Sequence, residues 1–277
     1  AFTSHPLLAT VVNPGAISSA EVTGDTSVDL LVVGFGNREL QILAGQSSGV
    51  SKTFDYNISV NIGPMAAAVA DFDKDGITDV AVLSSGSKSI DLLTGQGNGL
   101  FTLTSSLNTN DTSTAVLAVD LRSSGVTDLI AVNNTKSQVR VFLNNNDGTF
   151  AAPSDITVGS APVAISTQDF NHDGIPDVVV VNNNSNSVSV LLGTGTGGFL
   201  AKQDYAVGGS PSAVDVADLN NDGVIDLVVT NQSSNSVSVL LGNGNGTFQT
   251  HVDYTVGTAP VAVVAADLNG DGKIDVV

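Results

Sequence analysis

The stretch that decides the fold reads DFDKDGITD at residues 71–79. The same nine-residue pattern returns as DFNHDGIPD at 169–177, DLNNDGVID at 218–226 and DLNGDGKID at 267–275. Two weaker copies stand at 21–29 (EVTGDTSVD) and at 120–128 (DLRSSGVTD). The starts of the copies are 49 or 50 residues apart. A fixed period of this size indicates one supersecondary unit repeated along the chain, and it is long enough for a propeller blade.

Outward from each loop, the repeat predicts four short strands joined by turns. In the copy at 159–208, an apolar strand at 163–166 precedes the loop, and the β-branched run DVVVV begins at 177. Next come SVSVLLG at 187–193, the glycine-rich turn GTGTGGF, and LAKQDYAVG at 200–208. Short alternating or β-branched runs between such turns are typical of strands and hairpins. Because no segment shows helical periodicity, we expect an all-β fold, a β-propeller of four-stranded antiparallel blades.

The two ends of the chain bear on the number of blades. The segment FTSHPLLATVVNPGA (2–16) aligns with FQTHVDYTVGTAPVA (248–262), so we expect the N-terminal residues to form an outer fourth strand. The final DVV (275–277) falls in strand two of the sixth repeat. We therefore expect a single β-propeller domain over residues 1–277, with six blades closed by the two ends. Seven blades is the alternative if the sequence is a fragment.

The loops have the chemistry of a site for a hard cation. Positions 1, 3, 5 and 9 of the four intact loops carry Asp or Asn, position 6 is Gly, and position 7 would lend a backbone carbonyl. Alternate side chains of a tight loop can turn toward one centre, and a Gly with positive φ allows the sharp turn. The predicted metal ligands are Asp71, Asp73, Asp75, Ile77, Asp79, Asp169, Asn171, Asp173, Ile175, Asp177, Asp218, Asn220, Asp222, Val224, Asp226, Asp267, Asn269, Asp271, Lys273 and Asp275.

Five or six oxygen ligands favour Ca²⁺ over Mg²⁺, which requires a stricter octahedron. Zinc is disfavoured because the chain has no Cys and only His172 lies in an intact loop. An EF-hand needs a bidentate Glu at position 12 and flanking helices, whereas position 12 here is Val82, Val180 or Val229 inside an expected strand. The sequence therefore predicts about four Ca²⁺ sites, one for each intact loop.

The two weaker copies, here called the degenerate loops, depart from this pattern. In the loop at 120–128, positions 3 and 5 are Arg122 and Ser124, and a cationic side chain opposes metal binding. In the loop at 21–29, position 3 is Thr23 and Thr26 replaces the Gly of position 6. We expect neither loop to bind a metal ion.

The distribution of charge agrees with cation binding. The chain has 27 acidic and 9 basic residues, a net charge of −18, and 18 of the acids lie in the six loops. No basic stripe is present to meet phosphates, so nucleic acid is not an expected partner. No apolar run is long enough to span a bilayer. A cysteine-free chain rich in Ser, Thr, Asn and Gly is compatible with a secreted bacterial protein.

The unit resembles the FG-GAP repeats of integrin α-subunit propellers, and more closely the bacterial FG-GAP-like and VCBS-type repeats. The residues that carry the resemblance are the four intact loops, the turns that end in Phe, and the segments GSAP, GGSP and GTAP at 159, 208 and 257. The resemblance covers essentially the whole chain. It implies a propeller whose loops bind Ca²⁺ on one face, with roles in adhesion, ligand recognition or scaffolding at a cell surface or after secretion.

Two classes of function stay open. The first is a non-catalytic interaction or adhesion module that binds a protein or glycan on a propeller face. The second is a sugar-binding propeller, or one attached to a polysaccharide lyase or hydrolase. The chain has three His residues, no GxSxG context, and Asp residues already assigned to metal, so we do not expect an enzyme. Trp is absent and the three Tyr residues (56, 205 and 254) lie in expected fourth strands, so packing explains them better than sugar stacking.

Overall fold

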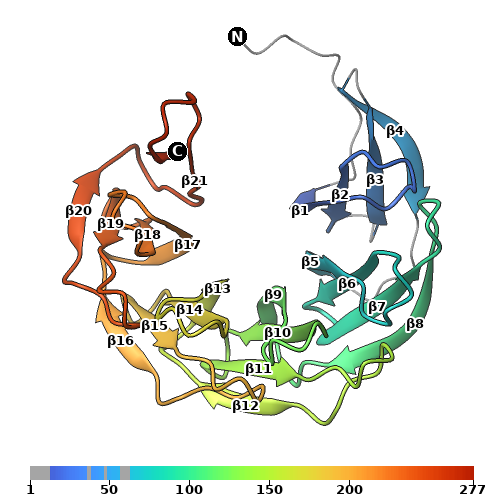
Figure 1. Ribbon diagram of the computed structural model, residues 1–277, viewed down its shortest axis with the longest axis horizontal. Helices are drawn as coiled ribbons and strands as arrows, with labels where there is room; N and C mark the ends of the chain where they lie inside the picture. The colour runs from blue at the N-terminus through green and yellow to red at the C-terminus, as the bar shows by residue number, and fades with distance from the viewer. Residues whose placement is uncertain (1–12, 36–38, 47–48, 57–62) are drawn as a thin grey trace. The chain divides into compact units, whose positions relative to one another are not determined.

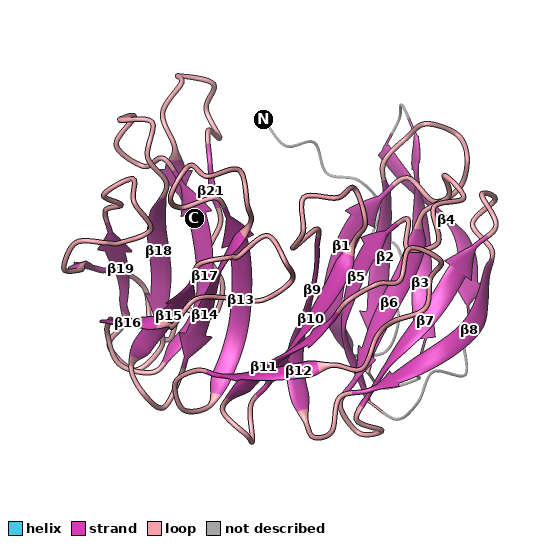
Figure 2. Ribbon diagram, turned by 60° about the horizontal axis from the view of Figure 1, so that its bottom comes forward, coloured by secondary structure: helices cyan, strands magenta, loops and turns pink. Residues whose placement is uncertain are grey.

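A computed structural model describes residues 13–35, 39–46, 49–56 and 63–277. Over this part, the chain consists of strands, turns and loops without a helix (Figure 2). Accordingly, none of the described segments is a helix with the length and apolarity that crossing a membrane needs. The outer strand expected from the N-terminal residues, with His5, lies outside the described residues.

The described strands form five four-stranded sheets and one two-stranded sheet. In every four-stranded sheet, strands that follow one another in sequence are hydrogen-bonded neighbours (Figure 1). The first two sheets are β1 (Pro14–Ala20), β2 (Asp29–Gly34), β3 (Glu39–Gln46) and β4 (Gly49–Tyr56), then β5 (Pro64–Ala70), β6 (Asp79–Ser84), β7 (Ser89–Gly95) and β8 (Phe101–Asn108). The third sheet is β9 (Ser113–Val119), β10 (Asp128–Asn133), β11 (Gln138–Phe142) and β12 (Ser154–Thr157).

The remaining strands repeat this order. The fourth sheet is β13 (Pro162–Gln168), β14 (Asp177–Asn182), β15 (Ser187–Leu191) and β16 (Gln203–Ala206). The fifth is β17 (Pro211–Ala217), β18 (Asp226–Asn231), β19 (Ser236–Leu240) and β20 (Val252–Thr255), and the two-stranded sheet is β21 (Ala265–Ala266) with β22 (Asp275–Val276). Repeated four-stranded antiparallel sheets without helix confirm the expected fold class, a β-propeller.

The second strand of a sheet is the most buried one. All six residues of β6, β10, β14 and β18 are buried. A strand covered on both faces needs apolar side chains on both faces, which is why DVVVVN reads as a continuous run instead of an alternating one. The first strand is different, because β1, β5, β13 and β17 each begin at a Pro whose pairing is irregular. The missing N–H of Pro costs nothing at such a place.

The chain divides into two compact units, residues 1–116 and 117–277. In the first unit, β1–β4 and β5–β8 share a core in which Leu31, Ile42, Val80 and Val82 are fully buried. A buried side chain from the loop at 21–29, Val22, belongs to the same core. The core therefore anchors the loop between the first two strands.

In the second unit, β13–β16 and β17–β20 share a core built from Val188, Val190, Leu227 and other valine and leucine side chains. Phe248 lies at its edge, where it forms an edge-to-face contact with Phe170 at 5.4 Å between ring centroids. Phe248 ends the third turn of its repeat, whereas Phe170 is position 2 of the preceding repeat's loop. The core thus joins the loop of one repeat to the turn of the next.

Candidate metal centre

Each nine-residue loop joins the first strand of a sheet to the second. The loops at 71–79 and 169–177 lie between β5 and β6 and between β13 and β14, and the other loops hold the equivalent place. Position 9 is always the first residue of the second strand. In these two loops position 2 points inward, because Phe72 and Phe170 are only 3% and 2% exposed. Both ends of these loops are thus fixed to the core, while positions 4 to 6 face solvent.

The Asp at position 9 is a buried acceptor for backbone N–H groups. Asp177 Oδ2 accepts a hydrogen bond from the Phe170 N–H at 2.9 Å, and its Oδ1 accepts one from Gly193 at 2.7 Å. Asp29, Asp79 and Asp226 accept the equivalent pair. These charge-assisted bonds tie the loop to the end of the third strand. The sequence pattern predicts only a metal-binding role for the Asp at position 9. An Asp also stands at position 9 of both degenerate loops, Asp29 and Asp128, and this is the signal in the sequence for its structural role.

The Asp at position 1 closes the loop from the other side. Asp71 Oδ2 accepts a hydrogen bond from the Gly76 N–H at 2.9 Å, and the other intact loops have the same bond at 2.8 Å. The Gly residues at position 6 have φ between 80° and 87°. No atom lies within 4 Å of where a Cβ would be, so the backbone angle and not space requires Gly there. The predicted positive φ at position 6 is confirmed.

The side chains at positions 3 and 5 accept hydrogen bonds from the loop's own backbone. Asn171 Oδ1 accepts from the Asp173 N–H at 3.0 Å, and Asp173 Oδ1 accepts from the Ile175 N–H at 2.8 Å. The loops at 71–79, 218–226 and 267–275 repeat both bonds. Alternate side chains therefore turn back over the same short stretch of backbone. The contribution of the carbonyl groups of Ile77, Ile175, Val224 and Lys273 stays a prediction.

In the loop at 71–79, three of the predicted ligand side chains come together. Carboxylate oxygens of Asp71, Asp73 and Asp79 lie within 4.8 Å of one another. Asp71 Oδ1 is buried and has no hydrogen-bond partner. An unsatisfied buried carboxylate oxygen is costly, and a cation among three carboxylates would remove that cost. The residues present thus fit a hard divalent cation, for which these oxygens would be ligands.

The raised pKa values of the position-9 carboxyl groups also favour a bound cation in the intact loops. Burial raises the pKa of Asp79, against the effect of its two backbone hydrogen bonds, and the negative charges of Asp73 and Asp75 raise it further. The pKa values of Asp177 and Asp226 are raised by burial and by neighbouring loop carboxylates in the same way. A bound cation would offset both the burial and the mutual repulsion of the carboxylates.

Comparison with known families identifies the repeat. The model of the FG-GAP-like repeat matches residues 22–82, 71–131, 120–180, 169–229 and 218–277, nearly the whole chain. The chain belongs to the FG-GAP-like repeat family. No curated protein matches this chain in sequence.

Solved structures with the same fold are distant in sequence. A lectin from Agrocybe aegerita, solved for its recognition of non-reducing terminal N-acetylglucosamine, is 19% identical with a TM-score of 0.65 over 96% of this chain and 74% of its own. A functionally unknown protein from Desulfotomaculum acetoxidans is 14% identical with a TM-score of 0.66, over 92% and 73%. A putative 6-phosphogluconolactonase from Bacteroides uniformis is 13% identical with a TM-score of 0.66, over 95% and 74%. At these identities, the likeness shows a shared fold alone.

The degenerate FG-GAP-like loop at 21–29 is held by protein groups. Glu21 Oε1 accepts hydrogen bonds from the N–H groups of Gly24 and Asp25, and Asp29 Oδ2 accepts from Val22 and from Thr23. Thr26, which replaces the position-6 Gly, has φ of 71°. A β-branched residue is strained in that region. The loop keeps the backbone path of an intact loop without its ring of carboxylates.

Among the described residues, Tyr205 packs against the core, whereas His172 and His251 lie in a loop and near a sheet edge. Tyr205, in β16, forms an edge-to-face contact with Phe248 at 5.6 Å, and its hydroxyl accepts a hydrogen bond from the Phe248 N–H at 3.2 Å. His172 lies at position 4 of its loop, exposed, with φ of 61°. His251 Nε2 lies 3.8 Å from Asp253 Oδ2 on the edge of the fifth sheet. The positive φ at position 4 was not expected from the sequence.

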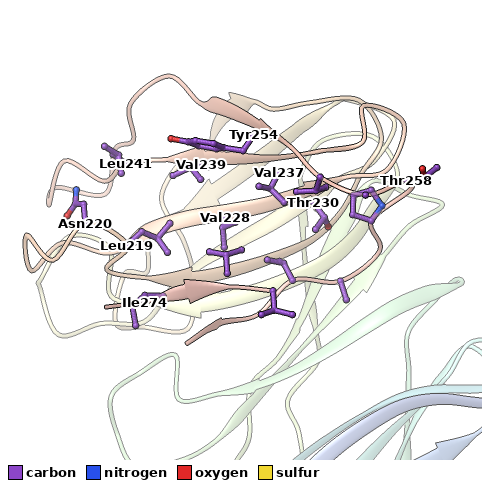
Figure 3. Close-up of a pocket in the computed structure, with 17 residues that line it drawn as sticks. Leu219, Asn220, Val228, Thr230, Val237, Val239, Leu241, Tyr254, Thr258 and Ile274 are labelled. Carbon is purple, nitrogen blue, oxygen red and sulfur yellow. The ribbon is translucent and has the colours of Figure 1, made fainter. Parts of the chain in front are cut away.

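A pocket of about 700 Å³ lies on one face of the sheet β17–β20 (Figure 3). Its lining is mostly apolar and includes Val237, Val239, Leu241 and Tyr254. The residues 49 positions earlier are Val188, Val190, Leu192 and Tyr205, which all pack into the core shared with the following sheet. The pocket is therefore lined by the equivalents of the residues that the fourth repeat packs against the fifth.

Proposed function

We propose that this protein is a calcium-binding, non-catalytic interaction or adhesion module that works outside the cell, secreted or at the cell surface. The observation that carries the proposal is the loop at 71–79. Its Asp71 Oδ1 is buried without a partner, beside two further carboxylates within 4.8 Å. The same pattern recurs in register at 169–177, 218–226 and 267–275. The partner would be a protein or a glycan bound at the surface formed by the repeats.

Calcium has a structural role in this proposal. It would bind the folded loop, where the carboxylates are already gathered, and not the unfolded chain, so it stabilises the fold by mass action. Extracellular sites of this chemistry bind with Kd values of about 10⁻⁴ to 10⁻³ M. At a tenfold excess over Kd, each site would contribute about 1.4 kcal/mol to the free energy of unfolding.

The test is thermal unfolding of the full chain with calcium and with a chelator. We expect a lower Tm in chelator, and we expect Asp75→Ala with Asp222→Ala to remove part of the calcium-dependent difference. Asp25→Ala is the matched control, because Asp25 stands at position 5 of a degenerate loop and should leave the difference unchanged. Identical unfolding curves with and without chelator would reject the structural role of calcium.

The ligand class needs a separate test. A glycan array and binding to extracellular-matrix proteins, both in calcium, would distinguish a carbohydrate-binding propeller from a protein-binding module. A hydrolytic or lyase activity that Asp75→Ala and Asp222→Ala abolish, with the fold intact, would instead indicate a calcium-dependent enzyme. The distant fold likeness to a lectin does not favour one of these outcomes, because it is supported by 19% identity only.

A further inference from the structure

The third repeat differs from the intact ones where a cation is proposed to bind. Position 3 of its loop is Arg122 and position 5 is Ser124, whereas the second repeat has carboxylates at both. A third difference lies outside the loop, at the end of the third strand. Asn144 stands there, where the other described repeats have a Gly. These three changes meet at one place in the structure.

The guanidinium group of Arg122 lies against the buried carboxylate of position 9. Its Nη2 donates to Asp128 Oδ1 at 2.7 Å, and its Nε donates to Asp128 Oδ2 at 3.3 Å. The same Nη2 donates to the Asn144 carbonyl oxygen, also at 2.7 Å. Asp128 is 0% exposed, so this ion pair neutralises a charge that has no access to water. The side chain thus joins the loop to the third strand.

Asn144 completes this arrangement. Its N–H donates to Asp128 Oδ1 at 2.8 Å, and its side-chain Nδ2 donates to the Thr127 carbonyl oxygen at 3.1 Å. In the second, fourth and fifth repeats, a Cβ at this place would lie 2.2–2.4 Å from the carbonyl oxygen of position 8. Real Cβ atoms do not approach that closely, so the intact geometry requires Gly. The third repeat therefore has its own local geometry, in which the Asn side chain fits.

The other carboxylate of this loop is also satisfied by protein donors. Asp120 accepts hydrogen bonds from the N–H groups of Gly125 and Arg122 and from the Ser124 hydroxyl. This differs from Asp71, whose Oδ1 is buried without a partner. In addition, the Ser123 hydroxyl donates to the Gly174 carbonyl oxygen in the next loop at 3.0 Å. The loop at 120–128 is closed by its own groups and supports its neighbour.

We propose that Arg122 is a built-in cation that replaces the metal ion in the third repeat. Its guanidinium group neutralises Asp128 and fixes the loop to the third strand, so this loop keeps its fold when calcium is removed. The contrast with the intact loops rests on the proposed function. The role of Arg122 itself rests only on the contacts above. The third repeat is thereby a calcium-independent element among calcium-dependent ones.

The experiment is hydrogen exchange of the full chain, followed by mass spectrometry, in calcium and in chelator. For the unchanged protein, we expect peptides covering 120–128 to exchange at the same rate in both. Peptides covering 71–79 and 169–177 should exchange at least about tenfold faster in chelator. In Arg122→Gln, peptides covering 120–128 should exchange faster in both conditions. The variant Arg122→Asp with Ser124→Asp and Asn144→Gly should make this loop's protection calcium-dependent and add one bound Ca²⁺.

Two results would overturn the proposal. One is acceleration of 120–128 by chelator as large as that of 169–177 in the unchanged protein. The other is unchanged exchange of 120–128 in Arg122→Gln. If no loop of the unchanged protein responds to chelator, the calcium proposal fails, while the Arg122→Gln result still decides the role of Arg122. The unchanged protein and Arg122→Gln give this decision even if the triple variant does not fold.

Discussion

At the scale of single residues, the loop carboxylates separate into two kinds. Asp177 at position 9 is fully buried and accepts backbone N–H groups with both oxygens, whereas Asp173 at position 5 is exposed. The first would hold the loop in place with or without calcium. The second would matter chiefly as a ligand. The loss of unfolding free energy on substitution should therefore depend on calcium differently at the two positions.

We expect Asp177→Ala to destabilise the fold by about 3 kcal/mol in chelator, because it leaves two buried N–H groups without an acceptor, and by more in calcium, because a predicted metal ligand is also lost. Asp173→Ala should cost about 1.4 kcal/mol in calcium and little in chelator. Urea unfolding of both variants, with and without calcium, measures the difference. An equal cost of Asp173→Ala in the two conditions would contradict a ligand role for position 5.

Thr26 provides a second prediction at this scale. It is exposed and has φ of 71°, in a region where β-branched residues are strained. Thr26→Gly should stabilise the protein by about 1 kcal/mol, because Gly adopts this angle without strain. The measurement is the change in Tm, with Thr23→Gly in the same loop as the control. A lower Tm for Thr26→Gly would show that the hydroxyl or the methyl group of Thr26 has a stabilising contact.

At the scale of the element, the repeated sheet could be predicted from the sequence with good detail. The 49-residue period and the β-branched run after each loop both correspond to features of β13–β16 and its equivalents. These predictions succeed because the order of apolar and polar residues in a strand reflects which of its faces are buried. The short fourth strands β16 and β20 were harder, because few residues of LAKQDYAVG are held by pairing.

The candidate site was predicted only in part. Oxygen-rich side chains spaced two apart, with Gly at position 6, are visible in a sequence. The partners of Asp177, by contrast, include Gly193, which is 16 residues away, and a contact of that range cannot be seen in the nine-residue motif. The same holds for Arg122. Its charge was read as opposing metal, but its bond to Asn144 depends on how the third strand returns to the loop.

The shared core of β13–β16 and β17–β20 gives a prediction at this scale. Leu227 in β18 is fully buried in that core, whereas Leu200 is 56% exposed. Leu227→Ala should destabilise the second unit by about 2–5 kcal/mol, because the free energy of burying the removed atoms is lost and a cavity is left in the core. Leu200→Ala should change the stability by less than about 0.5 kcal/mol. Thermal unfolding of both variants in calcium tests this contrast, and similar effects would refute the assigned core.

At the scale of the whole molecule, the pH dependence of stability follows from the carboxyl groups. In the calcium-free chain, Asp79, Asp177 and Asp226 have pKa values above 3.8, chiefly because they are buried. A raised pKa gives stability that is present at low pH and lost as the pH rises through it. Asp267 behaves in the opposite way, because backbone hydrogen bonds from Gly272 and Gly270 lower its pKa.

We therefore expect the Tm in chelator to rise as the pH falls from neutral toward the raised pKa values of Asp79, Asp177 and Asp226, and to fall again below about pH 3.8. The net charge of −18 adds self-repulsion in the same direction over the upper part of this range. Saturating calcium should reverse the upper trend, because protons compete with the cation for the carboxylates. Asp177→Asn should weaken the rise in chelator. A Tm in chelator that falls steadily as the pH falls from neutral would contradict the assignment.

The number of calcium ions that the whole chain holds tests the assignment of the intact loops as metal sites. Equilibrium dialysis of the full chain against radioactive calcium at millimolar concentration measures that number directly. We expect about four bound Ca²⁺ ions, one for each intact loop, and none after Asp75, Asp173, Asp222 and Asp271 are all changed to Ala. Binding of no calcium would contradict the account, and so would binding of six, because the loops at 21–29 and 120–128 would then also be filled.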